Sequence, residues 1–359
     1  MEEDPRIQTV FTVPPDAFNR GVAQHLQQIG ALLLPWPQAV RERFDLALTA
    51  SYGGLAELHA PALVMAHGAG HGKATRPSGR RGPVLTTAPV YGLDPQRLTR
   101  DGEVLPAAIA LSHDHELDIL RRQCPDAVPV AVVAGDPCFD RLVASLPERA
   151  RYRKALGVDD DRELVVVSST WGRTGLFGNQ PDLLPLIMQQ LPEQRFRVAA
   201  LLHPAVWCAH GRRQVRAWLR SCREAGLILP DPEDDWRSVV VAADHVVGDH
   251  GSVTTYAAAL GRNVLHLAPG LSAVTAGSAQ EATIGGADRL DPRRPLLDQL
   301  RAVSPVDPAT VAARLTSRPG QAGLVLRQTM YRLLGLGEPG RHRRPTPVPT
   351  PRVRPEQSS

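Results

Sequence analysis

The sequence contains little lysine and little cysteine. Of its 41 lysine and arginine residues only Lys73 and Lys154 are lysines, so the place of Lys73 in a glycine-rich stretch draws attention. The four cysteines form no CxxC pair, which indicates the reduced thiols of a cytoplasmic protein. No apolar run approaches the roughly 18 residues of a membrane-spanning helix. The acidic start MEEDPRIQ is unlike a secretory signal. We therefore expect a cytoplasmic protein.

The 359 residues suit two domains of ordinary size, and a hydrophobic content of 43% is typical of globular proteins. Most of the net charge of +4 lies in residues 336–359, which contain five arginines and two glutamates. The rest of the chain is nearly neutral, so we expect no nucleic-acid partner. Six prolines predict that 336–359 is a disordered tail. Its arginines leave open a weak electrostatic contact with anionic lipid at the inner membrane face.

Short apolar runs alternate with helical patterns, which predicts an α/β protein with parallel sheets. The strand candidates of the two halves are 9–13, 31–36, 44–50, 61–67, 107–112 and 128–135, then 163–170, 196–203, 226–230, 245–250 and 263–269. Helical patterns cover 16–30, 114–124 and 146–157. We predict two Rossmann-like doubly wound domains, residues 1–145 on the acceptor side and 146–335 on the nucleotide side. They would face each other across a cleft, the GT-B arrangement.

The glycine-rich stretch HGAGHGK (67–73) follows a strand candidate. It fits neither the GxxxxGK[ST] phosphate loop nor the GxGxxG dinucleotide fingerprint. His67 would lie at the carboxyl end of a strand, where an imidazole suits a general base, and Gly68 and Lys73 would lie beside the substrate. A Zn²⁺ site formed by His67, His71 and the later segment SHDHE is an alternative. The glycines argue against a helix that would align the two histidines, so we predict no metal.

The stretch VVGDHGSVTTYAAALGRNVL (246–265) predicts a strand, a polar turn and an immediate helix start. Backbone N–H groups and the dipole at such a start favour phosphate. Here Gly251 would let the ligand approach, and Ser252 would cap the helix and donate to a phosphate oxygen. The predicted phosphate-binding residues are Gly248, Asp249, His250, Gly251 and Ser252.

Two further strand ends supply polar residues: LLHP ends in His203-Pro204, and SSTWGR contains Thr170 and Arg173. Protonated His203 or Arg173 would neutralise charge that grows as a bond to phosphorus breaks. Thr170 would join them in binding substrate.

Together these motifs resemble the CDP-glycerol glycerophosphotransferases of bacterial teichoic-acid synthesis. That family has, in order, WHG…K, GxPRxD, a PTWR-like strand end, a His-Pro pair, and DYSS before a helix and an LGKPV strand. The matching stretches, which span about residues 60–270, are His67-Gly68…Lys73, GDPCFDRL (135–142), SSTWGR (168–173), LLHP (201–204) and GDHGSVTTYAAALGRNVL (248–265). The departures are Ala66 for Trp, Cys138-Phe139 for an Arg-polar pair and His250-Gly251 for Tyr-Ser.

The resemblance implies that His67 and His203 form a catalytic pair and that the turn at 248–252 binds the diphosphate of a nucleotide donor. The expected reaction transfers an activated polyol phosphate, by default glycerol phosphate from CDP-glycerol, to a hydroxyl acceptor without a cofactor. Two alternatives stay open. One is a nucleotide-sugar glycosyltransferase or UDP-sugar 2-epimerase-like enzyme of the same fold. The other is a catalytically divergent binding or regulatory protein.

Overall fold

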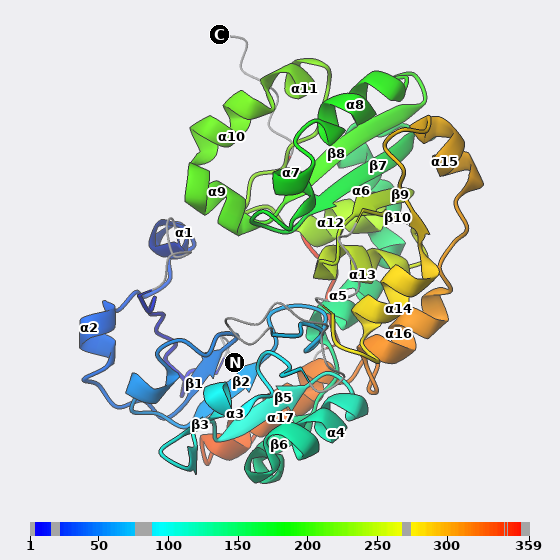
Figure 1. Ribbon diagram of the computed structural model, residues 1–359. Coiled ribbons are helices and arrows are strands. Elements are labelled where there is room, and N and C mark those ends of the chain that lie inside the picture. Colours follow the sequence, from blue (N-terminus) through cyan, green and yellow to red (C-terminus); the bar gives the residue numbers. More distant parts are fainter. Residues whose placement is uncertain are drawn as a thin grey trace. The chain divides into compact units, whose positions relative to one another are not determined.

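The protein folds into two α/β units, which together confirm the predicted fold class of two Rossmann-like domains. The computed structural model (Figure 1) describes residues 4–15, 22–75, 88–267, 274–340, 342 and 344–352. Unit 1 comprises residues 1–140, 275–278 and 315–345, and unit 2 comprises residues 141–274, 279–314 and 346–359.

The sheet of unit 1 has four parallel strands in the order β1-β2-β5-β6. The strands of the unit, including the small β3-β4 ladder, are β1 Ala47–Thr49, β2 Ala62–Met65, β3 Thr99–Arg100, β4 Glu103–Val104, β5 Ala108–Leu111 and β6 Ala131–Val133. Its helices are α1 Val22–Gln28, α2 Trp36–Ala39, η1 Leu55–Glu57, α3 Pro95–Leu98, α4 Asp114–Gln123, η2 Pro125–Val130, α5 Pro137–Ser145, which continues into unit 2, and α17 Ala322–Leu333.

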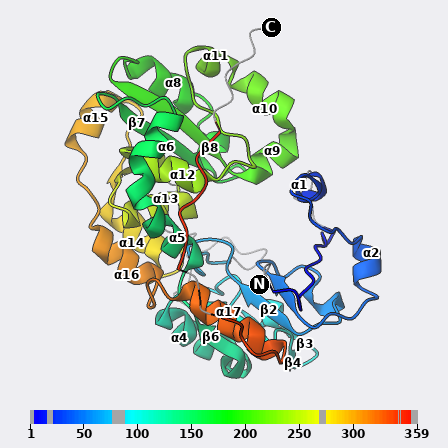
Figure 2. The same cartoon turned by 180° about the vertical axis from the view of Figure 1, so that it is seen from behind.

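Both faces of this sheet are covered, because side chains alternate between the faces along a strand. Ile109 and Leu111 of β5 pack with residues of α4 in one buried cluster. Ala108 and Ala110 pack with Leu326 of α17 in another, and Figure 2 shows α17 running across this face. The small alanines leave room for a helix from the far end of the chain.

Asp140 fixes the start of α17 on unit 1. Its carboxylate accepts hydrogen bonds from the backbone N–H groups of Gly320 (2.6 Å) and Ala322 (3.0 Å). Asp140 is 6% exposed, and its carboxylate satisfies the N–H of Ala322, the first residue of α17, together with that of Gly320 just before the helix. Asp140 ends the GDPCFD motif, so this motif aspartate has a structural role.

The sheet of unit 2 has five parallel strands in the order β11-β10-β9-β7-β8. The strands are β7 Glu163–Ser169, β8 Phe196–Leu202, β9 His245–Gly248, β10 Asn263–His266 and β11 Asp288–Arg289. The helices are η3 Leu146–Glu148, α6 Arg149–Ala155, α7 Leu176–Asn179, α8 Leu183–Gln190, α9 Pro204–His210, α10 Arg212–Trp218, α11 Arg220–Glu224, α12 Trp236–Ala242, α13 Ser252–Ala259, α14 Ala279–Gly286, α15 Leu296–Ala302 and α16 Pro308–Leu315.

Helices cover both faces of the unit 2 sheet as well. Val165 and Val167 of β7 pack with α8, α9, α10, α11 and α15 in one buried cluster. Leu164 and Val166 alternate to the other face, where α12 contacts β7 and α6. The stacked rings of Trp236 and Tyr256 join α12 to α13, 5.8 Å between centroids.

The observed division of the chain differs from the predicted domains 1–145, 146–335 and 336–359 in two respects. First, residues 315–345 return to unit 1, because that sheet needs α17 to bury its second face. Second, part of the predicted disordered tail is ordered: Val348 is 4% exposed. Its N–H donates to Ser145 Oγ and its carbonyl accepts from Tyr152 Oη at 2.6 Å. Residues 341, 343 and 353–359 of that tail lie outside the described part of the chain.

Candidate active site

The turn between β9 and α13 is organised by Asp249, whose side chain is buried. Oδ2 accepts hydrogen bonds from the N–H and the hydroxyl of Thr170, both at 2.8 Å, and from the N–H of Leu176 at 2.9 Å. Oδ1 accepts from the N–H of Gly251 at 3.0 Å. One carboxylate therefore binds four donors and joins the turn after β7 to the turn after β9. This arrangement makes Asp249 a positioning residue, with its oxygens occupied by protein.

These two turns lie at the switch point of the unit 2 sheet. The chain runs from β7 to its neighbour β8, then returns to the opposite side of β7 to form β9. In sheets of this kind ligands bind outside the carboxyl ends of the strands where the order reverses. Thr170 follows β7 and Asp249 follows β9, so the switch point coincides with the Asp249 hydrogen bonds.

The turn requires glycine for reasons of packing. A Cβ on Gly248 would collide with the side chain of Thr254 in the first turn of α13, and one on Gly251 would lie 2.7 Å from Thr170 Cγ2. Gly251 thus lets Thr170 approach, whereas the sequence suggested that it lets the ligand approach. Gly251 occupies the N-cap position of α13. Because glycine has no side chain, the N-cap residue accepts no side-chain hydrogen bond from the first N–H groups of the helix. Ser252 is the first helical residue and, like His250, is partly exposed.

His203 lies at the end of the strand next to β7 and begins α9. Its Nδ1 accepts a hydrogen bond from Ala205 N–H at 3.1 Å, so in the neutral ring the proton is on Nε2. The His203 backbone N–H donates to Ser169 O at 3.0 Å, which connects the ends of β7 and β8. Arg173 lies on the exposed part of the loop that follows Thr170.

In unit 1, His67 and Lys73 lie on the loop that follows β2. Both side chains reach solvent. Nearby protein atoms reduce the hydration of His67 and, together with the charges of Lys73 and His71, lower its pKa below the ordinary value. A lowered pKa keeps more of the imidazole in the neutral form that can accept a proton. Gly68 accepts a hydrogen bond from Gly70 N–H at 2.8 Å, so the loop turns back on itself immediately after His67.

The same loop wraps around Glu116 of α4, a residue that the sequence reasoning did not single out. Glu116 Oε1 accepts from His71 N–H at 2.7 Å, and Oε2 accepts from Ser112 N–H at 2.7 Å. His71 Nδ1 lies 3.2 Å from Oε2, and its Nε2 lies 3.4 Å from Tyr52 Oη. His71 and Glu116 are both buried, 5% and 2% exposed. Glu116 is the third residue of α4, whose N-cap is His113, so the S/T-x-x-E spacing of a capping box is absent and the sequence carried no specific signal for this role.

Both ring nitrogens of His71 thus face protein partners, whereas the side chain of His67, the other histidine of the HGAGHGK motif, reaches solvent. Within the described ranges no three His, Cys, Asp or Glu side chains come together as a metal site would require. His113 and His115, the other histidines considered for a metal, contact each other through Nδ1 atoms 3.0 Å apart at the start of α4.

The Glu116–His71 pair predicts a specific dependence of stability on pH. Burial alone would raise the pKa of Glu116, but the adjacent His71 and two backbone N–H donors lower it to about 2. Because the pKa is lower in the folded state, the stabilisation is complete at pH values above the pKa of ~4.3 in the unfolded state. It is lost as the pH falls toward 2.

Urea titrations should show Glu116→Gln to be less stable by about 2–4 kcal/mol at pH 7 and to lose less stability between pH 5 and 2. Glu103→Gln, an exposed glutamate of β4, is the control; equal acid sensitivity of Glu116→Gln and wild type would contradict the pairing.

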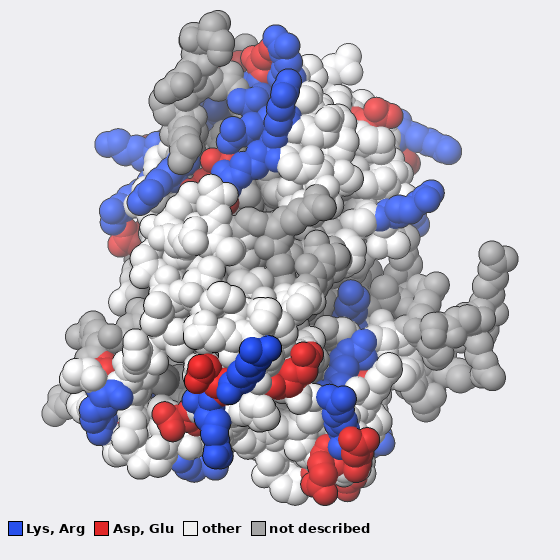
Figure 3. Space-filling view, turned by 90° about the vertical axis from the view of Figure 1, so that its left-hand side faces the viewer, with Lys and Arg blue, Asp and Glu red and all other residues white. Residues whose placement is uncertain are grey.

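Cationic side chains on unit 2 are partly neutralised. Arginines of α10 and α11 form the patch of blue side chains in the upper part of Figure 3. Arg212 pairs with Glu233 and Asp231, Arg216 pairs with Asp231 at 2.6 Å, and Arg220 pairs with Glu224 at 2.8 Å. The charge on this surface is therefore smaller than the count of arginines suggests. Among the described residues no helix is both long and apolar enough to cross a bilayer.

The fold has clear counterparts among solved structures. A variant of the wall teichoic acid polymerase TagF, soaked with CDPG (CDP-glycerol), superposes with a TM-score of 0.59 over 91% of this chain and 88% of its own, at 12% identity. Another variant of TagF gives 0.56 over 90% and 87%, at 14% identity. The S. aureus MnaA–UDP structure gives 0.53 over 90% and 95%, at 11% identity. The chain has a GT-B-like fold.

At these identities the similarity concerns the fold. No protein-family model matches the sequence, and no curated protein matches it significantly. The predicted site residues fall into two groups: Thr170, Asp249 and Gly251 are brought into contact in unit 2, next to His203, whereas His67 and Lys73 share the loop after β2 in unit 1. The predicted pairing of His67 with His203 joins residues of both units and stays a prediction.

Proposed function

We propose that the protein is a transferase that binds a nucleoside-diphosphate-activated donor at the carboxyl edge of the unit 2 sheet. The observation that supports this most is the Asp249 carboxylate, which fixes two turns and the start of α13 at a switch point. An anion there would meet backbone N–H groups and the positive end of the helix dipole. Ser252, His250 and Arg173 are the side chains proposed to bind the phosphates.

His203 is proposed to stabilise the leaving nucleotide. Because Nδ1 accepts from Ala205 N–H, the neutral ring carries its proton on Nε2, and this N–H is the group proposed to donate to a phosphate oxygen. A donor held in place by the start of α9 needs little reorganisation as negative charge develops on the departing phosphate. The proposed bond change is cleavage of the phosphoanhydride: the β-phosphoryl group with its polyol moves to an acceptor hydroxyl, and the nucleoside monophosphate leaves.

His67 is proposed as the general base that removes the proton of the acceptor hydroxyl. The lowered pKa makes it neutral over a wider pH range than an ordinary imidazole. Lys73 contributes to that lowering, and it is the residue whose removal should be visible in a pH profile.

Lys73→Met should therefore move the acidic limb of the kcat/KM profile to higher pH. The reason is that loss of the nearby positive charge raises the pKa of His67, so the imidazole loses its proton and can act as a base only at higher pH. The profile is measured between pH 5 and 9 with the donor that the wild type uses. Lys154→Met, a change at the exposed lysine of α6, is the control. An acidic limb that stays in place, or moves to lower pH, would exclude His67 as the titrating group.

CDP-glycerol is the proposed donor, and a nucleotide sugar is the second candidate, favoured by the similarity of the fold to the MnaA–UDP structure. Analysis of products separates them. Incubation with CDP-glycerol and a hydroxyl acceptor should release CMP, whereas glycosyl transfer from a UDP-sugar would release UDP. If neither CDP-glycerol nor a UDP-sugar binds or turns over, a divergent binding or regulatory protein replaces both proposals.

A further inference from the structure

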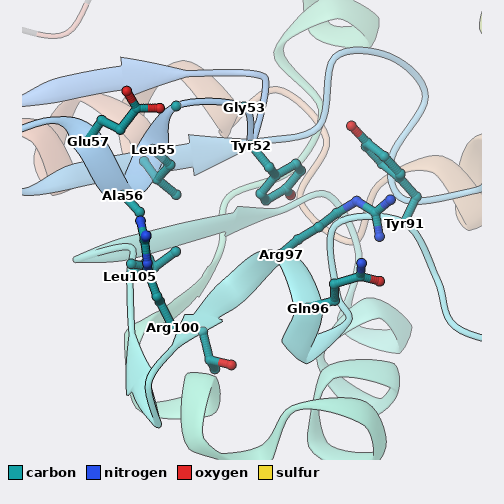
Figure 4. A pocket seen from close by; sticks show the side chains of 12 residues that line it. Tyr52, Gly53, Leu55, Ala56, Glu57, Tyr91, Gln96, Arg97, Arg100 and Leu105 are labelled. Atoms are coloured by element: carbon teal, nitrogen blue, oxygen red, sulfur yellow. The ribbon is translucent and has the colours of Figure 1, made fainter. Parts of the chain in front are cut away.

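Unit 1 contains a pocket of about 510 Å³ that none of the predicted site residues lines (Figure 4). It lies between the segment that follows β1, residues 52–57, and the segment 91–105, which contains α3 and the β3-β4 ladder. Its volume lies within the range of small-molecule sites.

Two tyrosines and one arginine make a fixed wall of this pocket. The rings of Tyr52 and Tyr91 meet edge to face, with centroids 5.7 Å apart. The Arg97 guanidinium lies over the Tyr91 ring at 4.2 Å and pairs with Asp94 at 2.8 Å. Figure 4 shows the Arg97 side chain extending toward Tyr91. Gly92 has φ +88°, and a Cβ there would collide with the Tyr52 hydroxyl, so the backbone is shaped around the tyrosine.

The charges of the pocket favour an uncharged ligand. Arg97 is neutralised by Asp94. Arg100 and Glu57 both line the pocket and are exposed, and neither makes an ion pair within the part of the chain that the structure describes. Glu57 would repel a strongly anionic ligand, and Arg100 would repel a strongly cationic one. Each can instead form hydrogen bonds with hydroxyl groups, Glu57 as acceptor and Arg100 as donor.

We propose that this pocket binds an uncharged sugar, with the tyrosine rings against its apolar face and Glu57, Arg100 and Gln96 bonded to its hydroxyls. Planar polar side chains beside a rigid aromatic wall fit a ring that has hydroxyls at its edge and C–H groups on its faces. Tyr52 also connects the pocket to the His67 loop. Its hydroxyl donates to Gly92 O at 3.1 Å and lies 3.4 Å from His71 Nε2. In the proposed transferase, and resting on that proposed function, the sugar would belong to the acceptor.

Saturation-transfer NMR on the full chain tests the proposal with maltose, chitobiose, glycerol and glycerol 3-phosphate as probes. We expect saturation of at least one disaccharide and no displacement of it by glycerol 3-phosphate. Glu57→Gln, which keeps the shape of an exposed side chain, should weaken binding about tenfold, and Tyr91→Ala about three- to tenfold. Arg41→Ala, at an exposed arginine of unit 1 outside the pocket, should bind as wild type.

The proposal is overturned if neither disaccharide binds, if glycerol 3-phosphate displaces the disaccharide, or if Glu57→Gln and Tyr91→Ala both bind as wild type. Titration of CDP and UDP into the same samples separates this result from the fate of the transferase proposal. If the protein binds nucleotide and no sugar, only the proposal of a sugar pocket is overturned. If it binds sugar and no nucleotide, the pocket proposal stands and the transferase proposal is overturned.

Discussion

Asp249→Ala should abolish nucleotide binding and destabilise unit 2 by about 3–5 kcal/mol. The carboxylate is 1% exposed, and its loss leaves the donors of Thr170, Leu176 and Gly251 without their acceptor. Each unsatisfied buried donor costs ~1–3 kcal/mol. The loop after β7 and the start of α13 would then be free to separate. Chemical denaturation and calorimetric titration of CDP and UDP measure the two effects.

Asp249→Asn and Asp182→Ala provide the matched comparisons for this change. The asparagine keeps one acceptor oxygen, which can satisfy the three donors that meet Oδ2, but turns an amide N–H₂ toward Gly251 N–H. It should therefore lie between wild type and alanine in both measurements. Asp182 is exposed at the N-cap position of α8 and makes no side-chain capping hydrogen bond there, so its replacement should change little. Wild-type affinity in Asp249→Ala would show that the two turns do not form the donor site.

His67→Ala should reduce turnover by ~10²-fold or more if the imidazole is the general base, while nucleotide affinity stays near that of wild type. The side chain reaches solvent and lies in unit 1, so its removal should leave the Asp249 turns intact. Steady-state rates with the donor that the wild type uses, together with titration of the nucleotide, separate the two quantities.

The control for His67→Ala is His59→Ala, an exposed histidine three residues before β2. It should show wild-type rates. Unchanged turnover in His67→Ala would remove the base from the mechanism. Loss of nucleotide affinity in that variant would instead indicate that the loop after β2 binds the donor.

The sequence predicted well the features that depend on neighbours along the chain. Apolar runs such as 163–170 and 196–203 became β7 and β8, and the polar turn before 252 became the start of α13. Parallel strands place their carboxyl ends at one edge, so Thr170 and Asp249 could be assigned to one site before their contact was seen.

Features that depend on distant parts of the chain were not predicted. Nothing in the sequence indicates that Ala108 and Ala110 pack against α17, which begins more than 200 residues later. Nor could spacing show that Glu116 would lie inside the glycine-rich loop, where a Cβ on Gly70 would collide with its carboxylate. The role of Gly251 was assigned to the ligand because a sequence does not reveal that Thr170 occupies the neighbouring space. The predicted cleft between the two units stays a prediction.

Calorimetric titration of Ser252→Ala and Lys73→Ala, side by side, tests the central claim that the diphosphate binds at the β7–β9 switch point. The ligand is CDP or UDP, whichever binds wild type more tightly. Loss of one charge-assisted hydrogen bond in Ser252→Ala should weaken binding by about 1–2 kcal/mol, while Lys73→Ala should bind nearly as wild type. If Lys73→Ala abolishes binding and Ser252→Ala leaves it unchanged, the donor belongs to the glycine-rich loop of unit 1 and the account is contradicted.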